Sequence, residues 1–174
     1  MKIIKTKFKG LLIVKQKNNK DARGNLREVY NKKIIKHDHF PFEYCTTSKK
    51  NSLRGFHFQL GKSQQAKYVS VFKGKILDCV IDLRRGSKTY EKIYKVVLSE
   101  DNCLSLYIPK GFGHAYYSYE KINIVYYKNS NYYDPKLESG VNVLDKDLKI
   151  NWPSKNLLIS KKDKKLMSLR EFKK

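Results

Sequence analysis

Histidine is the side chain best suited to accept or donate a proton near neutral pH, and this sequence contains four histidines. His57 lies in the segment Leu53–Gln59 (LRGFHFQ), where an Arg-Gly pair leads into alternating residues. On a regular strand His57 would share a face with Gln59, and Arg54 and Phe58 would lie on the other face. The His57 face is polar, so it either meets water or lines a cavity. From these residues alone, a hydrogen-bonded core histidine is the simpler interpretation.

His114 closes a Pro-x-Gly-x-x-His pattern over residues 109–114. This pattern resembles the second conserved box of the cupin superfamily, in which a strand ends, turns on glycine, and the next strand points a histidine into a barrel. A metal-binding cupin also has His-x-His and a following glutamate in its first box, whereas the segment around His57 has one histidine. His37 and His39 have that spacing but precede the expected barrel strand. We therefore expect a solvated loop there and no bound metal.

Alternation of apolar and polar residues dominates the chain and predicts the strands that must position these histidines. Short polar or glycine-containing segments separate the strands, which favours a sandwich or barrel over alternating helices and strands. Helical periodicity is confined to residues 28–35 and to the C-terminal tail, about residues 155–174. We predict a single all-β domain over residues 1–174 with short peripheral helices. The predicted strands cover residues 2–8, 11–15, 69–72, 75–83, 90–98, 103–108 and 122–127.

The chain is 174 residues long, and its 38 Lys and Arg against 16 Asp and Glu give a formal charge of +22. A charge of this sign raises nucleic-acid binding as a first interpretation. However, the lysines are scattered among apolar residues, and we find no zinc-finger spacing, RNA-recognition signature or helix-turn-helix pattern. Specific nucleic-acid binding is therefore not expected. A basic surface would still attract a small polyanionic substrate such as a nucleotide diphosphate.

Cys45, Cys79 and Cys103 are odd in number and widely spaced, so neither a disulfide framework nor a structural zinc site is expected. Cys79 falls in a strand-like run and is expected to be buried. The N-terminus carries lysines where a signal peptide needs an apolar stretch, and the apolar runs are too short to cross a bilayer. We expect a cytoplasmic protein without a membrane partner.

Six motifs in order resemble the dTDP-4-dehydrorhamnose 3,5-epimerase family, the metal-free cupin epimerases of nucleotide-linked 4-keto sugars. The resemblance runs from about Asp21 to Asp163. It implies a cupin fold, a double-stranded β-helix or jelly-roll barrel. It also implies a homodimer in which the N-terminal strands, about residues 1–20, are exchanged between subunits, and it implies no cofactor. The motifs are LRGFHFQ at 53–59, Lys67, GKILDCVIDLR at 74–84, IPKGFGH at 108–114, Tyr127-Lys128 with Tyr132-Tyr133, and INWP at 150–153.

The resemblance also assigns roles to four catalytic residues. His57 matches the family base, and Asp163 matches the carboxylate that orients it. Lys67 matches the lysine at the developing enolate oxygen, and Tyr127 matches the phenolic proton donor on the opposite face. These residue types suit the chemistry of the family. A ketone at C4 makes the protons on C3 and C5 acidic, and their removal requires a base and a cation that stabilises the enolate oxygen.

Substrate-binding residues carry over from the same resemblance. Two departures concern the part of the family site that holds thymine: Leu26 stands where the family usually has an aromatic residue, and Phe42–Ser48 lacks the customary Gln and Asn. The identity of the nucleotide therefore stays open. The matched binding residues are Arg23 and Glu28 at the nucleotide, Arg54 at the diphosphate, and Gln59, His114 and Tyr133 around the sugar.

We therefore expect an isomerase that inverts C3 and C5 of a nucleotide-diphosphate-linked 4-keto-6-deoxy sugar, for bacterial surface polysaccharide such as lipopolysaccharide or capsule. One alternative is a C3-only or C3/C5 epimerase of a GDP- or CDP-linked 4-keto sugar such as a heptose. A more distant alternative, from a different class, is a non-enzymatic basic barrel that binds nucleic acid or another anionic polymer. Deuterium exchange at C3 and C5 discriminates among the three.

Overall fold

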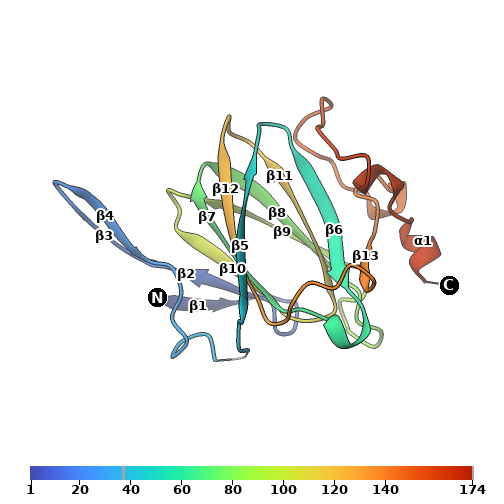
Figure 1. Cartoon of the computed structure of the whole chain (residues 1–174), viewed down its shortest axis with the longest axis horizontal. Coiled ribbons are helices and arrows are strands. Elements are labelled where there is room, and N and C mark those ends of the chain that lie inside the picture. Colours follow the sequence, from blue (N-terminus) through green and yellow to red (C-terminus); the bar gives the residue numbers. More distant parts are fainter. Residues whose placement is uncertain (37, 174) are drawn as a thin grey trace.

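The computed structural model describes residues 1–36 and 38–173, and most of its strands form two antiparallel sheets that face each other (Figure 1). The six-stranded sheet has the order β1 (Lys2–Lys5), β2 (Leu12–Lys15), β10 (Leu104–Ile108), β7 (Lys67–Lys73), β12 (Asn123–Asn129) and β5 (Phe42–Ser48). The five-stranded sheet has the order β13 (Glu138–Gly140), β6 (Leu53–Gln59), β11 (Phe112–Ser118), β8 (Lys75–Asp82) and β9 (Ile93–Ser99). Every strand predicted from the alternation is present, within three residues of its expected ends.

An apolar cluster fills one part of the space between the sheets. Val69 and Val71 of β7 meet Ile76 and Val80 of β8 there, and each of these side chains is at most 1% exposed. Burying an aliphatic side chain of this size contributes about 1.5–3 kcal/mol relative to leaving it in water. The period-two alternation therefore provides an interior face for both sheets. The rest of the interior, between β5, β12 and the strands β6, β11 and β13, holds polar side chains.

Residues 29–36 and 38–41 cover the outer face of the six-stranded sheet without forming the helix predicted over residues 28–35, so that prediction is wrong. Residue Glu28 is the last of a strand, and the N–H groups of Ile34 and Ile35 both donate to the Asn31 carbonyl, which closes a single turn. The Asn31 side-chain oxygen accepts a hydrogen bond from the Lys33 N–H at 2.9 Å. Such local side-chain bonds compete with helix formation.

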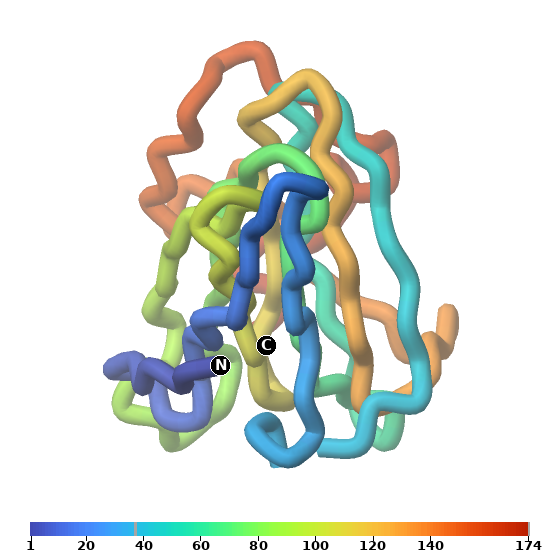
Figure 2. The backbone as a smooth tube through the Cα atoms, turned by 90° about the vertical axis from the view of Figure 1, so that its left-hand side faces the viewer, coloured from blue at the N-terminus to red at the C-terminus, as the bar shows by residue number. Residues whose placement is uncertain are grey.

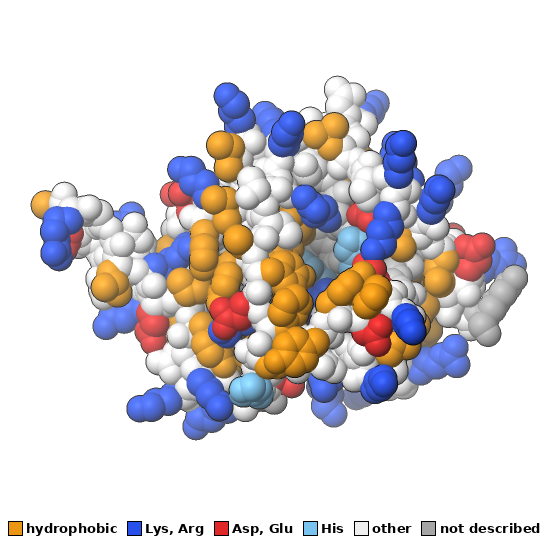
Figure 3. All heavy atoms as spheres, in the orientation of Figure 1, with side chains coloured by type: hydrophobic (Ala, Val, Ile, Leu, Met, Phe, Trp, Pro, Cys, Tyr) orange, Lys and Arg blue, Asp and Glu red, His pale blue; other side chains and the backbone are white. Residues whose placement is uncertain are grey.

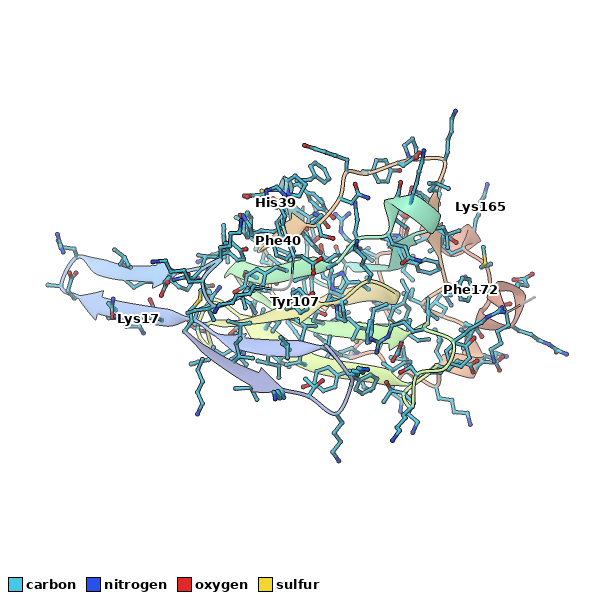
Figure 4. The ribbon with its side chains drawn as sticks, turned by 90° about the horizontal axis from the view of Figure 1, so that it is seen from below. Lys17, His39, Phe40, Tyr107, Lys165 and Phe172 are labelled. Carbon is cyan, nitrogen blue, oxygen red and sulfur yellow. The ribbon has the colours of Figure 1, made fainter. Side chains whose placement is uncertain are left out.

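This covering segment is held by a second apolar cluster on the outside of the sheet. Ile35 is fully buried there, and Phe40 packs edge-on against Tyr107 with ring centroids 6.5 Å apart. Figure 4 labels Phe40 and Tyr107 where the segment lies over the sheet. The apolar residues that produced the helical periodicity therefore serve to dock the segment, and His39 beside them is exposed in a loop as expected. His37 lies outside the described residues.

The C-terminal residues 141–173 cover the outer face of the five-stranded sheet and are mostly irregular. They contain the 3₁₀ turns η2 (Lys146–Leu148) and η3 (Asp163–Lys165) and the helix α1 (Leu169–Phe172), which begins with a capping box at Ser168. Short peripheral helices are thus confirmed, whereas a continuous helical tail over residues 155–174 is wrong. Isolated bridges hold the backbone to the barrel, for example where Leu158 exchanges hydrogen bonds with Asn51 and Leu53.

A two-stranded hairpin, β3 (Lys17–Asp21) and β4 (Gly24–Glu28), projects away from the barrel in Figure 1 and lies in front of the barrel in Figure 2. Figure 4 labels Lys17 where the hairpin leaves the barrel. Its side chains are largely exposed, including Leu26 at 69%. In the part of the chain that the structure describes, no helix is long and apolar enough to cross a membrane.

Candidate active site

One pocket, with a volume of about 150 Å³, opens between β5 and β12 of one sheet and β6, β11 and β13 of the other. Figure 3 shows it as a hollow near the middle of the face, with pale-blue histidine atoms visible inside. Most side chains in its walls carry charged, amide, hydroxyl or phenolic groups, and Phe58 is an apolar member. Seven of the residues predicted from the sequence line it: Arg54, His57, Gln59, Lys67, His114, Tyr127 and Tyr133.

The β6 strand does not place these residues as the simple alternation predicts. His114 of β11 pairs with His57, but Tyr116 pairs with Arg54, so Ala115 alone faces two residues of β6. Such a β-bulge shifts the alternation by one residue. Arg54 therefore lines the pocket together with His57, and the expectation that it lies on the opposite face is wrong. Only glycine fits within the bulge at Gly55, because its φ is +111° and a Cβ would lie 2.4 Å from a backbone oxygen.

His57 is paired with Asp163, which lies 106 residues further along the chain in the C-terminal segment. The imidazole Nε2 is 3.0 Å from Asp163 Oδ1, and the Gly55 N–H donates to Oδ2 at 3.1 Å. Burial by itself raises the pKa of Asp163, but these hydrogen bonds to His57 and Gly55 bring the pKa below its ordinary value. An ionised carboxylate only accepts hydrogen bonds, so Nε2 donates and Nδ1 of the neutral ring is left to accept a proton.

Lys67 extends from β7 into the same pocket and is buried. Its Nζ donates to the backbone carbonyl of His57 at 3.4 Å. Burial lowers the pKa of Lys67 to about 8, although the nearby carboxylates of Asp78 and Glu138 act in the opposite direction. The ammonium group is therefore mostly charged at neutral pH and lies beside the histidine, where it can stabilise an anion formed in the pocket.

Tyr127 reaches the pocket from β12 and is only 4% exposed. Burial raises the pKa of its phenol well above the ordinary value, so the hydroxyl keeps its proton at neutral pH. The ring packs edge-on against His114, whose Nε2 is 2.8 Å from Asp78 Oδ2. Since Tyr127 and His57 come from opposite sheets, a ligand between them would be flanked by a proton donor on one side and a base on the other.

The remaining predicted residues form the rim. Arg54 Nε donates to Ser48 Oγ at 3.0 Å. Gln59 is buried and accepts from the backbone of residue 134 through its Oε1, at 3.1 Å. Tyr133 is half exposed, and its hydroxyl donates to Glu138 Oε2 at 2.5 Å. The rim therefore combines a guanidinium group with amide and phenol groups suited to a phosphorylated sugar.

Arg23 and Glu28 are not brought to this pocket within one chain. Both lie on the projecting hairpin, where Arg23 pairs with Asp21 and its side chain is 91% exposed. Glu28 accepts a hydrogen bond from Asn31 at 2.6 Å.

Several pocket residues were not identified from the sequence. Asp78 does not line the pocket but contacts His114, and it had a signal, because an acidic residue in the middle of an apolar strand predicts a buried polar role. Tyr44, Thr46, Tyr116 and Glu138 had none, since only the pairing of distant strands places them at the pocket. Among residues 1–36 and 38–173, no cluster of three or more His, Cys, Asp and Glu is arranged to hold a metal ion. Cys79 is buried as predicted, and the three cysteines are free thiols.

The fold and the site together define a class: a cupin-type jelly-roll enzyme whose pocket carries a carboxylate-supported histidine opposite a protonated tyrosine. Comparison with known proteins gives the same answer. Residues 5–171 match the family described as dTDP-4-dehydrorhamnose 3,5-epimerase. The chain belongs to that family and is an epimerase, that is, an isomerase.

Individual relatives cover nearly the whole chain. A protein of Escherichia coli (strain K12) named dTDP-4-dehydrorhamnose 3,5-epimerase is 35% identical over 99% of this chain and 96% of its own length. A Bacillus anthracis epimerase structure with TDP and PPi bound is 35% identical, with a TM-score of 0.93 over 97% of this chain and 99% of that one. A Legionella pneumophila structure in complex with dTDP-4-keto-L-rhamnose is 33% identical, with a TM-score of 0.91 over 97% and 93% of the two chains.

Proposed function

We propose that this epimerase inverts C3 and C5 of a nucleotide-diphosphate-linked 4-keto-6-deoxy sugar through an enolate. The observation that carries the proposal is that His57, which lines one pocket with Lys67 and Tyr127, is paired with Asp163 at 3.0 Å. These four side chains supply a base, its supporting carboxylate, a cation for the enolate oxygen and an acid on the opposite side. No further chemical group is needed to balance the reaction.

His57 begins each inversion by accepting a proton from the carbon next to the ketone. Its Nδ1 is the free nitrogen, because Nε2 donates to Asp163. The electron pair of the broken C–H bond moves into the new carbon–carbon double bond, and the C4 oxygen becomes an enolate. Asp163 stabilises the imidazolium that forms and keeps the ring in its working orientation.

Lys67 stabilises that enolate. The Nζ is within reach of the His57 backbone, so the charge lies on the same side of the pocket as the base. A fixed charge in a site that excludes water is worth more than the same charge in solution and does not have to reorient during the reaction.

Tyr127 completes the inversion by donating its phenolic proton to the carbon from the opposite face. The strands β6 and β12 belong to different sheets, which supports this opposite approach. The cycle balances when the imidazolium releases its proton to solvent and the phenolate takes one back. Because C3 and C5 are both adjacent to C4, the same set of groups serves both carbons after the sugar shifts slightly.

For the nucleotide we propose dTDP, supported by the names of the relatives and by the nucleotide reported in the two bound structures. The Arg54 guanidinium at the rim suits a diphosphate, which it can bind through two hydrogen bonds.

We also propose a cytoplasmic location. The free thiols of Cys45, Cys79 and Cys103 support it, because cysteines stay reduced in the cytoplasm.

The decisive experiment incubates the enzyme with dTDP-, GDP- and CDP-linked 4-keto-6-deoxy sugars in heavy water and locates deuterium by mass spectrometry and NMR. Incorporation at both C3 and C5 of the dTDP sugar is the expected result. Incorporation at C3 alone, or only with a GDP- or CDP-linked sugar, would contradict the proposal in favour of a different epimerase. Salt-sensitive binding to nucleic acid without any incorporation would contradict the enzymatic function.

We further propose a two-fold homodimer in which the hairpin β3–β4 of each chain completes its partner's site. The projection of the hairpin from the barrel and the exposure of Leu26 and Arg23 support this arrangement (Figures 1 and 2). Light scattering should give the mass of two chains. Arg23→Ala should raise KM for the nucleotide sugar with little change in C3 exchange at saturation. A fully active monomer would contradict this assembly.

A further inference from the structure

Tyr44 lies directly across the strand pair from Tyr127, although neither composition nor motif singles it out. The two residues are register partners in the antiparallel pairing of β5 with β12. Their rings are stacked, with centroids 4.8 Å apart and planes 20° apart, and both line the pocket. Tyr44 is 38% exposed whereas Tyr127 is 4% exposed, so Tyr44 is the outer ring of the pair.

A second ring contact to Tyr127 comes from the opposite sheet. His114 of β11 meets the Tyr127 ring edge-on, with centroids 5.8 Å apart and an interplanar angle of 69°. His114 itself is held in place, because its Nε2 is 2.8 Å from the fully buried carboxylate of Asp78. Tyr127 therefore contacts a fixed histidine from the opposite sheet and Tyr44 from its own sheet.

Tyr44 stands on the less constrained side of this arrangement. The strand β5 is the last in the order of its sheet and pairs with β12 alone among the described strands. Behind Tyr44, the ring of Phe42 lies 5.4 Å away, and Tyr132 lies 6.1 Å beyond Phe42. The three rings form a row of contacts that runs from Tyr44 through Phe42 to Tyr132, and Tyr132 is 63% exposed to solvent.

We propose that Tyr44 is a positioning residue for Tyr127, and that its ring determines how efficiently the enzyme inverts C5 relative to exchanging the proton at C3. This inference rests on the proposed role of Tyr127 as the proton donor. Donation to carbon requires the phenol oxygen to stay within hydrogen-bond reach of the enolate, and a displacement of about 1 Å can cost about 10²-fold in rate. Without the Tyr44 ring, Tyr127 gains space toward the edge strand, away from the sugar. Proton removal by His57 does not depend on that ring.

The structure provides a matched control in the same sheet. Phe72 and Tyr126 are also stacked, with centroids 4.8 Å apart and planes 18° apart, but neither of them lines the pocket. Phe72 is 40% exposed, close to the value for Tyr44. Phe72→Leu therefore removes an equivalent ring without touching Tyr127.

The experiment compares Tyr44→Leu, Tyr44→Thr, Tyr44→Phe and Phe72→Leu with the unaltered enzyme, using kcat for C5 inversion and for C3 deuterium exchange with the dTDP-linked 4-keto sugar. Tyr44→Leu and Tyr44→Thr should lower C5 inversion by about 10- to 100-fold while changing C3 exchange by less than about threefold. Tyr44→Phe keeps the stacked ring and should restore the unaltered ratio. Phe72→Leu should leave both rates unchanged. Circular dichroism and light scattering confirm that each variant is folded and has the same oligomeric state.

Two outcomes would overturn the inference, and they differ from failure of the proposed function. Equal C5-to-C3 ratios in Tyr44→Leu and Phe72→Leu would show that the ring only stabilises the sheet. If Tyr44→Phe also lowers the ratio of C5 inversion to C3 exchange, the effect comes from the Tyr44 hydroxyl rather than from ring stacking. Failure of the unaltered enzyme to exchange either proton would instead reject the proposed function, and the inference with it. Tyr44→Thr, which suits an edge strand, provides the measurement if Tyr44→Leu does not fold.

Discussion

Two histidine–aspartate pairs lie side by side in this molecule, and they differ in how the aspartate is held. His57 and His114 are register partners on neighbouring strands, and each has Nε2 within 3.0 Å of a carboxylate oxygen. Asp163 accepts an additional hydrogen bond from the Gly55 backbone. By contrast, the second oxygen of Asp78 has no hydrogen-bond partner among residues 1–36 and 38–173. The same pair of residue types therefore stands in two different environments.

The difference shows that the balance between burial and hydrogen bonding determines the ionisation of these acids. Both carboxylates are at most 4% exposed. Burial raises the pKa of Asp78 above its ordinary value, whereas hydrogen bonds outweigh burial at Asp163 and lower its pKa. An ionised Asp163 can support a positively charged imidazole, which a general base needs. Asp78 is suited to hold His114 in place as part of the pocket wall.

The largest expected difference between the two pairs comes from replacing each histidine in turn. His57→Asn should reduce deuterium exchange at both C3 and C5 by about 10²–10⁴-fold, because it removes the proton acceptor. His114→Asn should reduce the rate less and mainly raise KM. Exchange measured by NMR in heavy water gives both values, with circular dichroism as the check on folding. Comparable losses in the two variants would contradict the assignment of a single base.

Removing the charges of the two acids should give unequal effects. Asp163→Asn should lower kcat by about 10²-fold or more, because an amide can hold the ring in the wrong tautomer and cannot support the imidazolium. Asp78→Asn keeps a hydrogen-bonding group beside His114, which forms part of the pocket wall, so it should cost less than about tenfold, the range of one hydrogen bond. Steady-state kinetics measure both. A larger loss in Asp78→Asn would reverse the roles of the two pairs.

A third buried aspartate sharpens the comparison by separating stability from catalysis. Asp82 lies outside the pocket and accepts hydrogen bonds from Arg84, Ser87 and Thr89. Burial opposes ionisation, but these donors lower the pKa of Asp82 from 3.8 to about 2. Asp82→Asn should reduce the free energy of unfolding by about 3 kcal/mol at pH 7, because it leaves the Arg84 guanidinium without the carboxylate that pairs with it.

The sign of the pH dependence follows from the lowered pKa. The stabilisation by Asp82 is fully present above about pH 3.8, the ordinary value, and is lost as the pH falls through about 2. Urea unfolding of Asp82→Asn and the unaltered protein should therefore give a difference that shrinks in acid. The kcat of the variant at pH 7 should remain near normal. A constant difference from pH 7 to pH 2 would contradict this account.

The smallest expected effect concerns Lys67 and the alkaline side of the pH profile. With the pKa of Lys67 lowered to about 8, kcat should fall about tenfold per pH unit above that value as the ammonium loses its charge. Lys67→Arg keeps a permanent charge, so its rate should be lower but should not fall in this range. If the kcat of the unaltered enzyme stays constant up to pH 9.5, the charge of Lys67 does not contribute to catalysis.

Regular alternation and local motifs made much of this architecture predictable. The strands around Val69, Ile76 and Leu106 are rich in Val, Ile, Leu and Tyr, and each appears close to its expected bounds. The hairpin over residues 17–28 was not predicted, because its residues are polar on both faces and carry no alternation. Residues 28–35 were assigned to a helix because apolar spacing cannot distinguish a helical face from a segment that docks through a few side chains.

The site was predictable where a motif fixed the residue and not where distant strands had to meet. His57, Lys67 and Tyr127 reach one pocket from three different strands, as the resemblance implied. The direction of Arg54 was predicted wrongly, because one extra residue in a bulge reverses the faces of a strand. Tyr44 gave no signal, since its importance depends on the ring across the strand pair.

The irregular C-terminal segment that carries Asp163 also makes activity sensitive to local opening. Its backbone is joined to the barrel through an isolated bridge at Leu158, and Met167 bridges Val141 just after β13, without a continuous ladder. Segments with so few shared hydrogen bonds open at a lower free energy than the sheets they cover. Each opening separates Asp163 from His57 while the two sheets stay intact. On heating, the enzyme should therefore lose turnover several degrees before its β-sheet circular dichroism changes.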